Sequence, residues 1–293
     1  MRTLRSCSAI GLGLLVLSHG GAGAYNILAI DMGASWQRSS VELLGAIEGY
    51  GTPGTPGQRY TTIVDYWDLA GEDLSRYDVL YVTSAYLDQA ISVPAAAALG
   101  ALSAKAPEIS QFLAHGGGVV AWAQPFPEGG AHAWDWVPLG PTSEGVHLGD
   151  DVVITDPGHP IFDRSSSASL SGWGPSSTGY FTQWDPRLHV VAEGVSPLGQ
   201  TLSTGAPQGG PAITLAGSLN STLAPLCGRV VFSMQAPDYQ IVHGAFGDEA
   251  RRFTEDALDW ASCTHPVPEP ASGLLLGVGA GIGWWARRRR RAS

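Results

Sequence analysis

Basic residues are scarce in this 293-residue sequence, which has 16 lysines and arginines against 26 aspartates and glutamates and a formal net charge of −10. Seven of the 16 lie in the terminal segments 1–24 and 287–293, so residues 25–268 contain nine basic and 25 acidic side chains, a formal charge of −16. Binding to a nucleic acid backbone depends on clustered lysine and arginine. The composition therefore argues against nucleic acid as a partner and predicts an acidic, soluble body.

Motifs of several enzyme classes are absent as well. The sequence has no G-x-S-x-G, H-E-x-x-H or G-x-x-x-x-G-K-[ST] segment, so the serine-hydrolase, zincin and P-loop classes lack their core residues. No motif names a reaction, and no cofactor is predicted.

The first 24 residues have the composition of a secretory signal peptide. Arg2 and Arg5 precede the apolar run 9–17, and residues 22–24 (Ala-Gly-Ala) have the small-x-small form of a cleavage site. The apolar run is too short to span a bilayer. We therefore expect export by the Sec machinery, with a mature chain that starts at Tyr25.

Three features follow one another at the C-terminus: the segment Val267, Pro268, Glu269, Pro270, then an apolar stretch at 271–286, then five arginines at 287–291. Sixteen residues in a helix measure about 24 Å, and arginines stay on the cytoplasmic side. We expect a linker with the motif at 265–270, a transmembrane helix at 271–286 and a basic cytoplasmic tail at 287–293.

This C-terminal order resembles the PEP-CTERM sorting signal. The resemblance implies recognition by an exosortase, a transient anchor in the inner membrane of a Gram-negative bacterium, and later release to the cell surface or the medium beside extracellular polysaccharide. It covers the C-terminal segment alone and implies nothing about the preceding residues.

Cysteine is rare, with three residues in the chain. Cys7 lies in the signal peptide, which leaves Cys227 and Cys263. Cys227 precedes the predicted strand 230–234, and Cys263 follows the predicted helix 249–262, which would return antiparallel to that strand. In an oxidising compartment this arrangement predicts a disulfide, although two unrelated buried thiols remain an alternative.

Residues 25–264 alternate apolar strand patterns with amphipathic helix patterns, which predicts an α/β domain with a parallel sheet and helices on both faces. A capping box, Ser39-x-x-Glu42, predicts the start of the first helix, and Pro107 is expected in the first turn of another. From Gln124 to about Gly210 the alternation is lost among many glycines, prolines and tryptophans, so we expect an irregular insertion there. The predicted strands are 25–30, 60–64, 79–83, 119–123, 152–154, 212–216 and 230–234.

Five segments of the body occur in an informative order: YNILAID, SRYDVLYVTSA, ISQFLAHGGGVVAW, GHPIFD and GRVVFSMQAPDY. Together they resemble the class I glutamine-amidotransferase-like superfamily, including its ThuA-like branch. The resemblance implies a flavodoxin-like α/β fold over most of residues 25–262.

The residues that would make such a domain a glutaminase are missing. Members of the superfamily place a nucleophilic cysteine in a G-x-C-x-G turn, where this chain has Trp122-Ala123-Gln124-Pro125. Their histidine and glutamate lie in a Gln-Phe-His-Pro-Glu segment, whose counterpart, residues 235–238, is Gln-Ala-Pro-Asp. The resemblance thus implies a non-catalytic domain.

Polar residues follow four predicted strands, at the edge where open α/β sheets place their ligands. The same residues could instead cap the helices that follow. Trp134 could stack on a sugar ring or pack in the core. His159 could act with Asp31 or Asp238 as an acid or base. The predicted ligand-binding residues are Asp31, Ser84, Gln124, Trp134, His159, Gln235 and Asp238.

Possible metal ligands are dense between residues 147 and 163, where two histidines and four aspartates occur at irregular spacing. Such oxygen-rich sets can bind a divalent ion, but acidic loop residues beside the strand 152–154 explain the same pattern. We predict no metal site.

The sequence therefore predicts an exported, exosortase-sorted protein whose domain binds a small molecule or glycan without catalysis. An extracellular hydrolase or isomerase that uses Asp31, His159 or Asp238 is the main alternative. An ice-binding protein is a second alternative, since proteins of that kind also have this C-terminal signal, but the body lacks a regular Thr-rich repeat.

Overall fold

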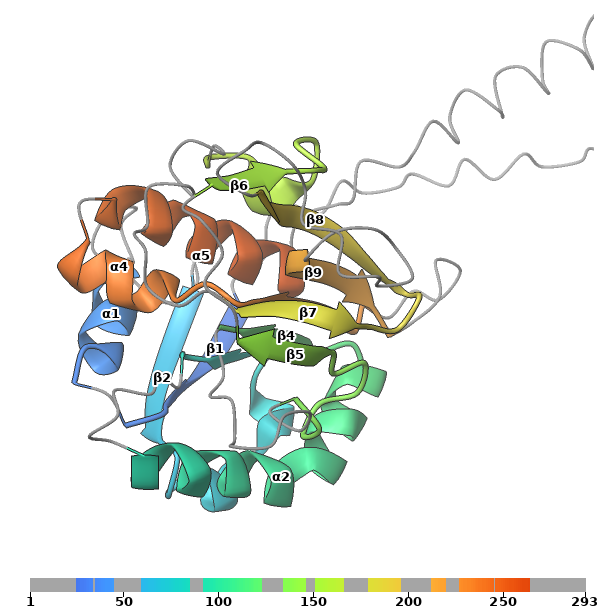
Figure 1. Cartoon of the computed structure of the whole chain (residues 1–293). Helices are drawn as coiled ribbons and strands as arrows, with labels where there is room; N and C mark the ends of the chain where they lie inside the picture. Colours follow the sequence, from blue (N-terminus) through green and yellow to red (C-terminus); the bar gives the residue numbers. More distant parts are fainter. Residues whose placement is uncertain are drawn as a thin grey trace, which may run out of the picture.

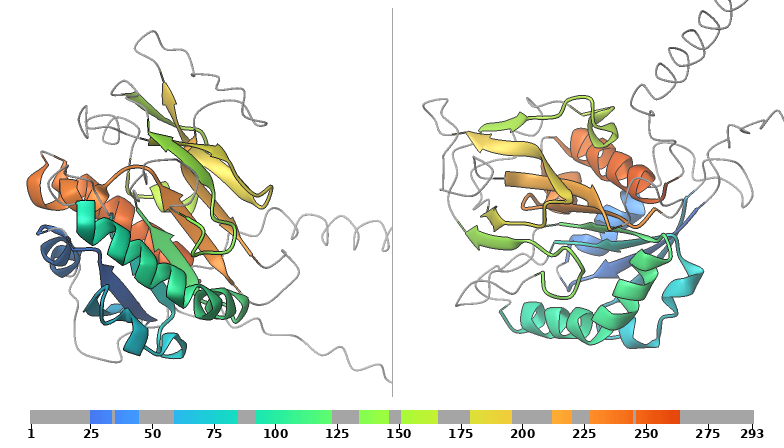
Figure 2. Two further views of the ribbon diagram at one scale, coloured as in Figure 1. Left: turned by 60° about the horizontal axis from the view of Figure 1, so that its bottom comes forward. Right: turned by 90° about the vertical axis from the view of Figure 1, so that its right-hand side faces the viewer.

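The computed structural model describes residues 25–33, 35–44, 59–84, 92–122, 134–145, 151–165, 179–195, 212–219, 227–244 and 246–263. The described residues form one large sheet with helices on both sides (Figures 1 and 2). The predicted signal peptide, sorting motif, transmembrane segment and basic tail lie outside them, as does Gln124. No helix among the described residues is long and apolar enough to cross a membrane.

Five parallel strands make up one half of the sheet, in the order β2-β1-β3-β4-β10. They are β1 (Tyr25–Asp31), β2 (Arg59–Asp65), β3 (Val79–Val82), β4 (Gly118–Ala121) and β10 (Arg229–Ser233). Relabelled by their sequence of appearance, they follow the doubly wound order 2-1-3-4-5.

Successive side chains of the central strands pack on opposite faces of the sheet, as the pleat requires. In β1, Leu28 and Ile30 belong to the core on one face, and Ile27 and Ala29 to the core on the other. Because both faces are buried, the strands are nearly continuous apolar runs. This pattern is why the sequence identifies them.

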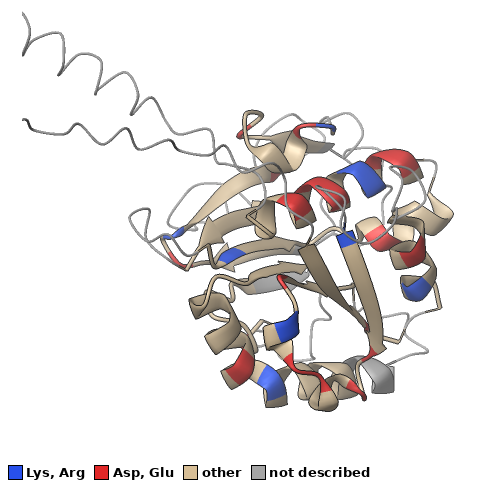
Figure 3. Ribbon diagram, turned by 180° about the vertical axis from the view of Figure 1, so that it is seen from behind, with Lys and Arg blue, Asp and Glu red and all other residues tan. Residues whose placement is uncertain are grey.

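Among the described residues, four helices cover the two faces. Helix α2 (Ser92–Ala114) packs Leu102, Ile109 and Leu113 into the first core, whereas α1 (Gln37–Leu44) and α5 (Gly247–Ala261) pack into the second. The short helix α4 (Pro237–His243) follows β10 and packs between α1 and α5. Helix α5 is rich in charged residues (Figure 3), and Arg251, Glu255 and Asp256 among them are buried. The predicted α/β fold with helices on both faces is confirmed.

The sheet is mixed rather than wholly parallel, which corrects the prediction. Antiparallel strands extend the sheet beyond β10, beginning with β9, and the other four come from the expected irregular insertion. This pairing joins segments far apart in the chain, so local sequence patterns do not reveal it. These strands are β5 (Thr142–Gly145), β6 (Asp151–Ile154), β7 (Gly179–Gln183), β8 (Leu188–Val195) and β9 (Ala212–Ser218).

Two predicted helix starts are wrong. Helix α1 begins at Gln37, so Ser39 lies inside the helix instead of capping it. Helix α2 begins at Ser92, so Pro107 lies in its interior, on an exposed position. Packing of α2 against the sheet outweighs the missing N–H of the proline.

Cys227 and Cys263 form a disulfide in the structure, with their Cα atoms 6.1 Å apart. The bond joins Cys227, two residues before β10, to Cys263, just after α5. Both lie at the amino ends of the parallel strands. There the chain passes so close to β4 that a Cβ on Gly118 would lie 2.3 Å from the Ala261 carbonyl oxygen. The end of α5 is therefore held to the sheet by a covalent link and by close backbone packing.

We predict that peptide mapping of the secreted protein under non-reducing conditions recovers one peptide pair joined through Cys227 and Cys263. The pair should separate on reduction. Two thiols that alkylate freely in the native protein would contradict the predicted bond.

Candidate functional site

The parallel strands end at one edge of the sheet, which we call the carboxyl edge. Asp31 ends β1, Ser84 follows β3, and Gln235 and Asp238 follow β10. All four side chains are buried, with exposed fractions of 8% or less. The structure thus brings four of the predicted ligand-binding residues to the edge where open α/β sheets place ligands.

Ser84 and Asp238 are hydrogen-bonded to each other. The backbone N–H and the hydroxyl of Ser84 both donate to Oδ2 of Asp238, at 3.0 and 2.8 Å. Neither residue has any exposed surface. The second carboxylate oxygen of Asp238, Oδ1, is also buried, and no residue that the structure describes donates a well-aligned hydrogen bond to it, although the backbone N–H groups of Asp238 and Tyr239 lie near the carboxylate and lower its pKa.

Burial raises the pKa of Asp238 from its usual 3.8 to about 6, although the hydrogen bonds from Ser84 act in the opposite direction. Burial also raises the pKa of the neighbouring Tyr81 well above its usual value, with a further contribution from the charge of Asp238. A buried carboxylate with an oxygen that accepts no hydrogen bond lowers the stability of the folded state. Such groups are candidates for functional sites.

Helix α1 fixes the position of Ser84 from the other side. The Gln37 side chain, which is fully buried, donates through Nε2 to the backbone carbonyl of Ser84. One residue earlier, the Thr83 hydroxyl donates to the Ile30 carbonyl at 2.8 Å and accepts from the Met32 backbone N–H at 3.3 Å. The turns after β1 and β3 are therefore tied together beneath the Ser84–Asp238 pair.

The environment of Asp31 is explained locally. Its Oδ1 accepts from the backbone N–H of Gly33 at 2.9 Å, in a turn where Gly33 has a φ of 100°. Its Oδ2 lies 3.7 Å from Nε of Arg38, which also binds Asp65. Burial raises the pKa of Asp31, and the hydrogen bond from Gly33 opposes this. Asp31 thus holds the turn after β1 and does not cap α1, which begins at Gln37.

Trp134 lies in the core instead of on the surface. It is 1% exposed, and its ring makes edge-to-face contacts with Phe181 and Phe232 at centroid distances of 5.6 and 5.3 Å. The alternation around Trp134 in the sequence is that of a half-buried segment, but both Trp134 and Trp136 lie in the core that Phe181 of β7 and Phe232 of β10 share. Its burial argues against a role as a sugar-stacking platform.

Exposed aromatic rings do occur at the carboxyl edge, on residues that the sequence analysis did not select. Tyr239 is 40% exposed, stacks on His243 at 4.9 Å and meets Trp36 edge-to-face at 5.3 Å. We call these three residues the aromatic cluster. Trp36 adjoins Gln37 and Tyr239 adjoins Asp238, so two of the three rings are next in sequence to a buried polar residue of the site. This adjacency is the feature of the sequence that could have identified them.

His159 is not part of the carboxyl edge. It precedes a short 3-10 helix, η3 (Pro160–Phe162), and packs against Trp260 at a ring distance of 4.9 Å. Trp260 lies in the last turn of α5, whereas Asp238 lies before the first turn of that helix. Burial lowers the pKa of His159 to about 4. The structure therefore does not group His159 with Asp31 and Asp238.

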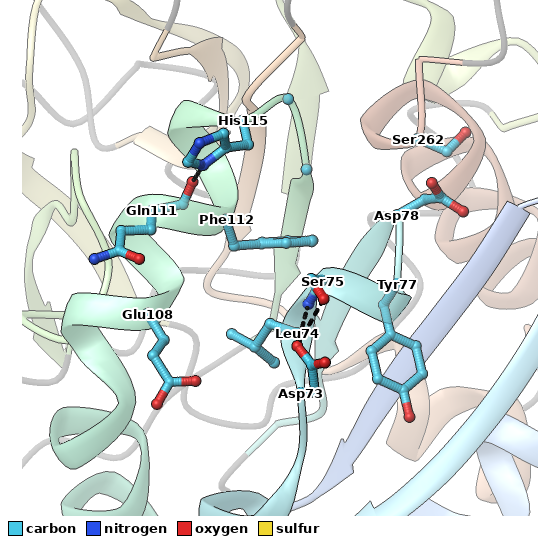
Figure 4. Close-up of a pocket in the computed structure, with 12 residues that line it drawn as sticks. Asp73, Leu74, Ser75, Tyr77, Asp78, Glu108, Gln111, Phe112, His115 and Ser262 are labelled. Atoms are coloured by element: carbon cyan, nitrogen blue, oxygen red, sulfur yellow. Dashed lines mark hydrogen bonds between the residues drawn. The ribbon is translucent and has the colours of Figure 1, made fainter.

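A cavity of about 590 Å³ opens at the opposite end of the sheet, among the residues that precede β3 and β4 (Figure 4). We call it the amino-edge groove. Its walls come from α2 and from the short 3-10 helix η2 (Leu74–Arg76). The lining residues are Asp73, Leu74, Ser75, Tyr77, Asp78, Glu108, Gln111, Phe112, His115, Gly116, Gly117 and Ser262.

Among the described residues, no group of three or more histidine, cysteine, aspartate or glutamate side chains is arranged to hold a metal ion. Of the possible ligands noted in the sequence, His147 and Asp150 lie outside those residues.

Comparison with protein families finds the PEP-CTERM protein-sorting motif at residues 266–291, as the sequence predicts. No curated protein matches the chain. Among solved structures, a protein described as ThuA-like from Bacteroides uniformis is 14% identical, with a TM-score of 0.43 over 83% of this chain and 92% of its own.

A glutamine amidotransferase from Thermotoga maritima is 8% identical, with a TM-score of 0.43 over 82% of this chain and 98% of its own. A second protein described as ThuA-like, from Parabacteroides merdae, is 14% identical, with a TM-score of 0.40 over 84% and 94%. Both kinds of protein that the sequence segments resemble are thus among the similar structures.

Proposed function

We propose that this protein is exported by the Sec machinery, anchored transiently in the inner membrane by residues 271–286, and released by an exosortase to the cell surface or the medium. The sorting motif at residues 266–291 supports exosortase-dependent export. The sequence pattern of residues 1–24 supports entry into the export pathway, and the arginines at 287–291 support an orientation that leaves residues 25–270 outside.

The exported domain, in this proposal, binds a small molecule or glycan at the carboxyl edge. The observation that supports it is the Ser84–Asp238 pair, in which Oδ1 of a fully buried carboxylate has no hydrogen bond from the described residues. A ligand hydroxyl or amine could donate to this oxygen after a movement of the surrounding side chains. Buried polar groups without a partner are uncommon in native proteins and call for an explanation.

Glycans are the ligand class that we favour. The aromatic cluster presents exposed rings beside Asp238, and aromatic faces pack against the apolar faces of sugar rings while nearby polar groups bind their hydroxyls. The sorting signal, by resemblance, places the protein beside extracellular polysaccharide.

Binding without catalysis fits the arrangement better than the hydrolase or isomerase alternative. A cluster of His159 with Asp31 and Asp238 would favour that alternative, but His159 packs on Trp260 in the last turn of α5, away from the two aspartates at the carboxyl edge. Acid–base chemistry at Asp238 alone remains the second candidate function, because a pKa of about 6 suits proton transfer near neutral pH.

A glycan array tests the proposal. We expect Tyr239→Ala to weaken binding of the best glycan about tenfold, equivalent to about 1.4 kcal/mol, because the exposed ring is lost while the fold is unaffected. Trp67→Ala is the matched control, since Trp67 is 60% exposed and follows β2 at the same edge, but its ring packs on Tyr66 and is not a member of the aromatic cluster. Equal binding by both variants and the wild type, or an array without any bound glycan, would contradict the glycan proposal.

A further inference from the structure

The end of the domain lies close to the start of the sorting motif. Ser262 lines the amino-edge groove, and the disulfide holds Cys263 to Cys227, which lies two residues before β10. The matched motif begins at residue 266, and three residues span at most about 11 Å. An enzyme that holds the motif therefore works within a short distance of the groove.

The other end of the domain leaves at the same place. Tyr25, the first residue of the predicted mature chain, starts β1, and its hydroxyl donates to Asp259 in the last turns of α5. Asn26 follows it and donates through its backbone N–H to Asp78, which lines the groove, at 2.7 Å. Both ends of the domain are therefore tied to the amino edge of the sheet.

The groove has an apolar floor and an acidic rim. Leu74 and Phe112 are buried beneath it, and Phe112 lies so close to Gly117 that a Cβ there would come within 2.3 Å of the ring. Three exposed carboxylates line the opening, those of Asp73, Asp78 and Glu108 (Figure 4). Hydrogen bonds from Ser75 hold the pKa of Asp73 below its usual value, so this rim residue remains charged.

Nearby cations offset only part of this charge. Lys105 pairs with Glu108 at 2.7 Å, but its side chain is 7% exposed, whereas that of Glu108 is 54% exposed. Arg76 lies near Asp73. The surface that a partner meets is therefore acidic at its rim.

We propose that the amino-edge groove docks a basic segment on the outer face of the exosortase, and so presents the sorting motif for cleavage. The groove lies next to the motif, the end of the domain that leads to the motif leaves from this edge, and the acidic rim complements a basic partner. Complementary rim charges mainly speed association. The inference depends on sorting and is independent of the ligand proposed for the carboxyl edge.

The test is a pulse-chase measurement of C-terminal processing in a host that has an exosortase. The variant Glu108→Lys with Gln111→Lys reverses the charge on the exposed side of α2 that lines the groove. The control, Glu42→Lys with Ser39→Lys, makes the same change in formal charge on exposed positions of α1. We expect the full-length chain of the groove variant to persist about fivefold longer than the wild type, and the control to be processed at the wild-type rate.

A second variant separates docking from folding. Gln111→Lys alone leaves the Lys105–Glu108 pair intact and should slow processing in the same direction, with an unchanged thermal unfolding curve. Processing at the wild-type rate in both groove variants would overturn the proposal. So would equal slowing in the groove and control variants, or an altered oligomeric state with normal processing, which would indicate a second copy of the chain in the groove.

Discussion

Replacing Arg59 with methionine is expected to lower the free energy of unfolding by about 4 kcal/mol, because two largely buried carboxylates lose a cation that they share. Arg59 is the first residue of β2, and its side chain is 7% exposed. Its Nε donates to Oδ1 of Asp259 at 2.7 Å, and Nη2 pairs with Oδ2 of the same residue. Glu255, whose side chain is 1% exposed, lies 3.7 Å from Nη1.

Arg164 also contacts this group of carboxylates, at 3.2 Å from Glu255, and limits the loss. The matched control is Arg252→Met, which removes an exposed pair with Glu249 on the same helix and should cost less than about 0.5 kcal/mol. Urea denaturation of both variants measures the difference. If both variants lose a similarly small free energy of unfolding, the buried ion pairs of Arg59 stabilise the fold no more than the exposed Arg252–Glu249 pair does.

Replacing Asp238 with asparagine is expected to stabilise the domain by about 2 kcal/mol at pH 7.5, because the ionised carboxylate is buried at a cost. The pKa of Asp238 is about 6 in the folded protein against an ordinary value of 3.8. Its contribution to stability is therefore complete below about pH 4 and is lost as the pH rises through 6. Asparagine does not titrate, so the gain should grow between pH 4 and 6 and vanish in more acidic solution.

Thermal unfolding across that pH range measures the effect, with the exposed Asp68→Asn as a control that should show no such dependence. The same Asp238 variant should bind the ligand more weakly by about tenfold to a hundredfold, since hydrogen bonds to a charged acceptor contribute about 1.5–3 kcal/mol. A variant that is both less stable and fully able to bind would contradict the role given to Asp238. Gained stability with lost binding is the expected combination at a functional site.

The parallel half of the fold could be predicted because the sequence patterns of its strands and helices are visible within short segments of the chain. Strands buried on both faces are continuous apolar runs, as in β1 and β10, and their alternation with helices indicates a parallel sheet. The antiparallel half could not be predicted in this way. It depends on which distant segments pair with β9, and that choice is made by tertiary contacts.

The candidate site was predictable in position but not in detail. Ser84 and Asp238 follow apolar strands, so their place at the carboxyl edge follows from topology. Their hydrogen bond joins residues 154 positions apart, and Gln37 reaches Ser84 from α1. Both contacts depend on how α1 and α4 pack. Trp134 shows the converse error, because a tryptophan between Ala133 and Asp135 looks half-exposed until the strands that cover it are known.

Hydrogen–deuterium exchange, with and without the glycan that binds best on the array, tests the central claim most directly. If the ligand occupies the carboxyl edge, added ligand should slow amide exchange at residues 31–44, 83–84 and 233–243 and leave the amino edge unchanged. Slowed exchange confined to residues 73–78 and 108–118, around the amino-edge groove, would contradict the claim.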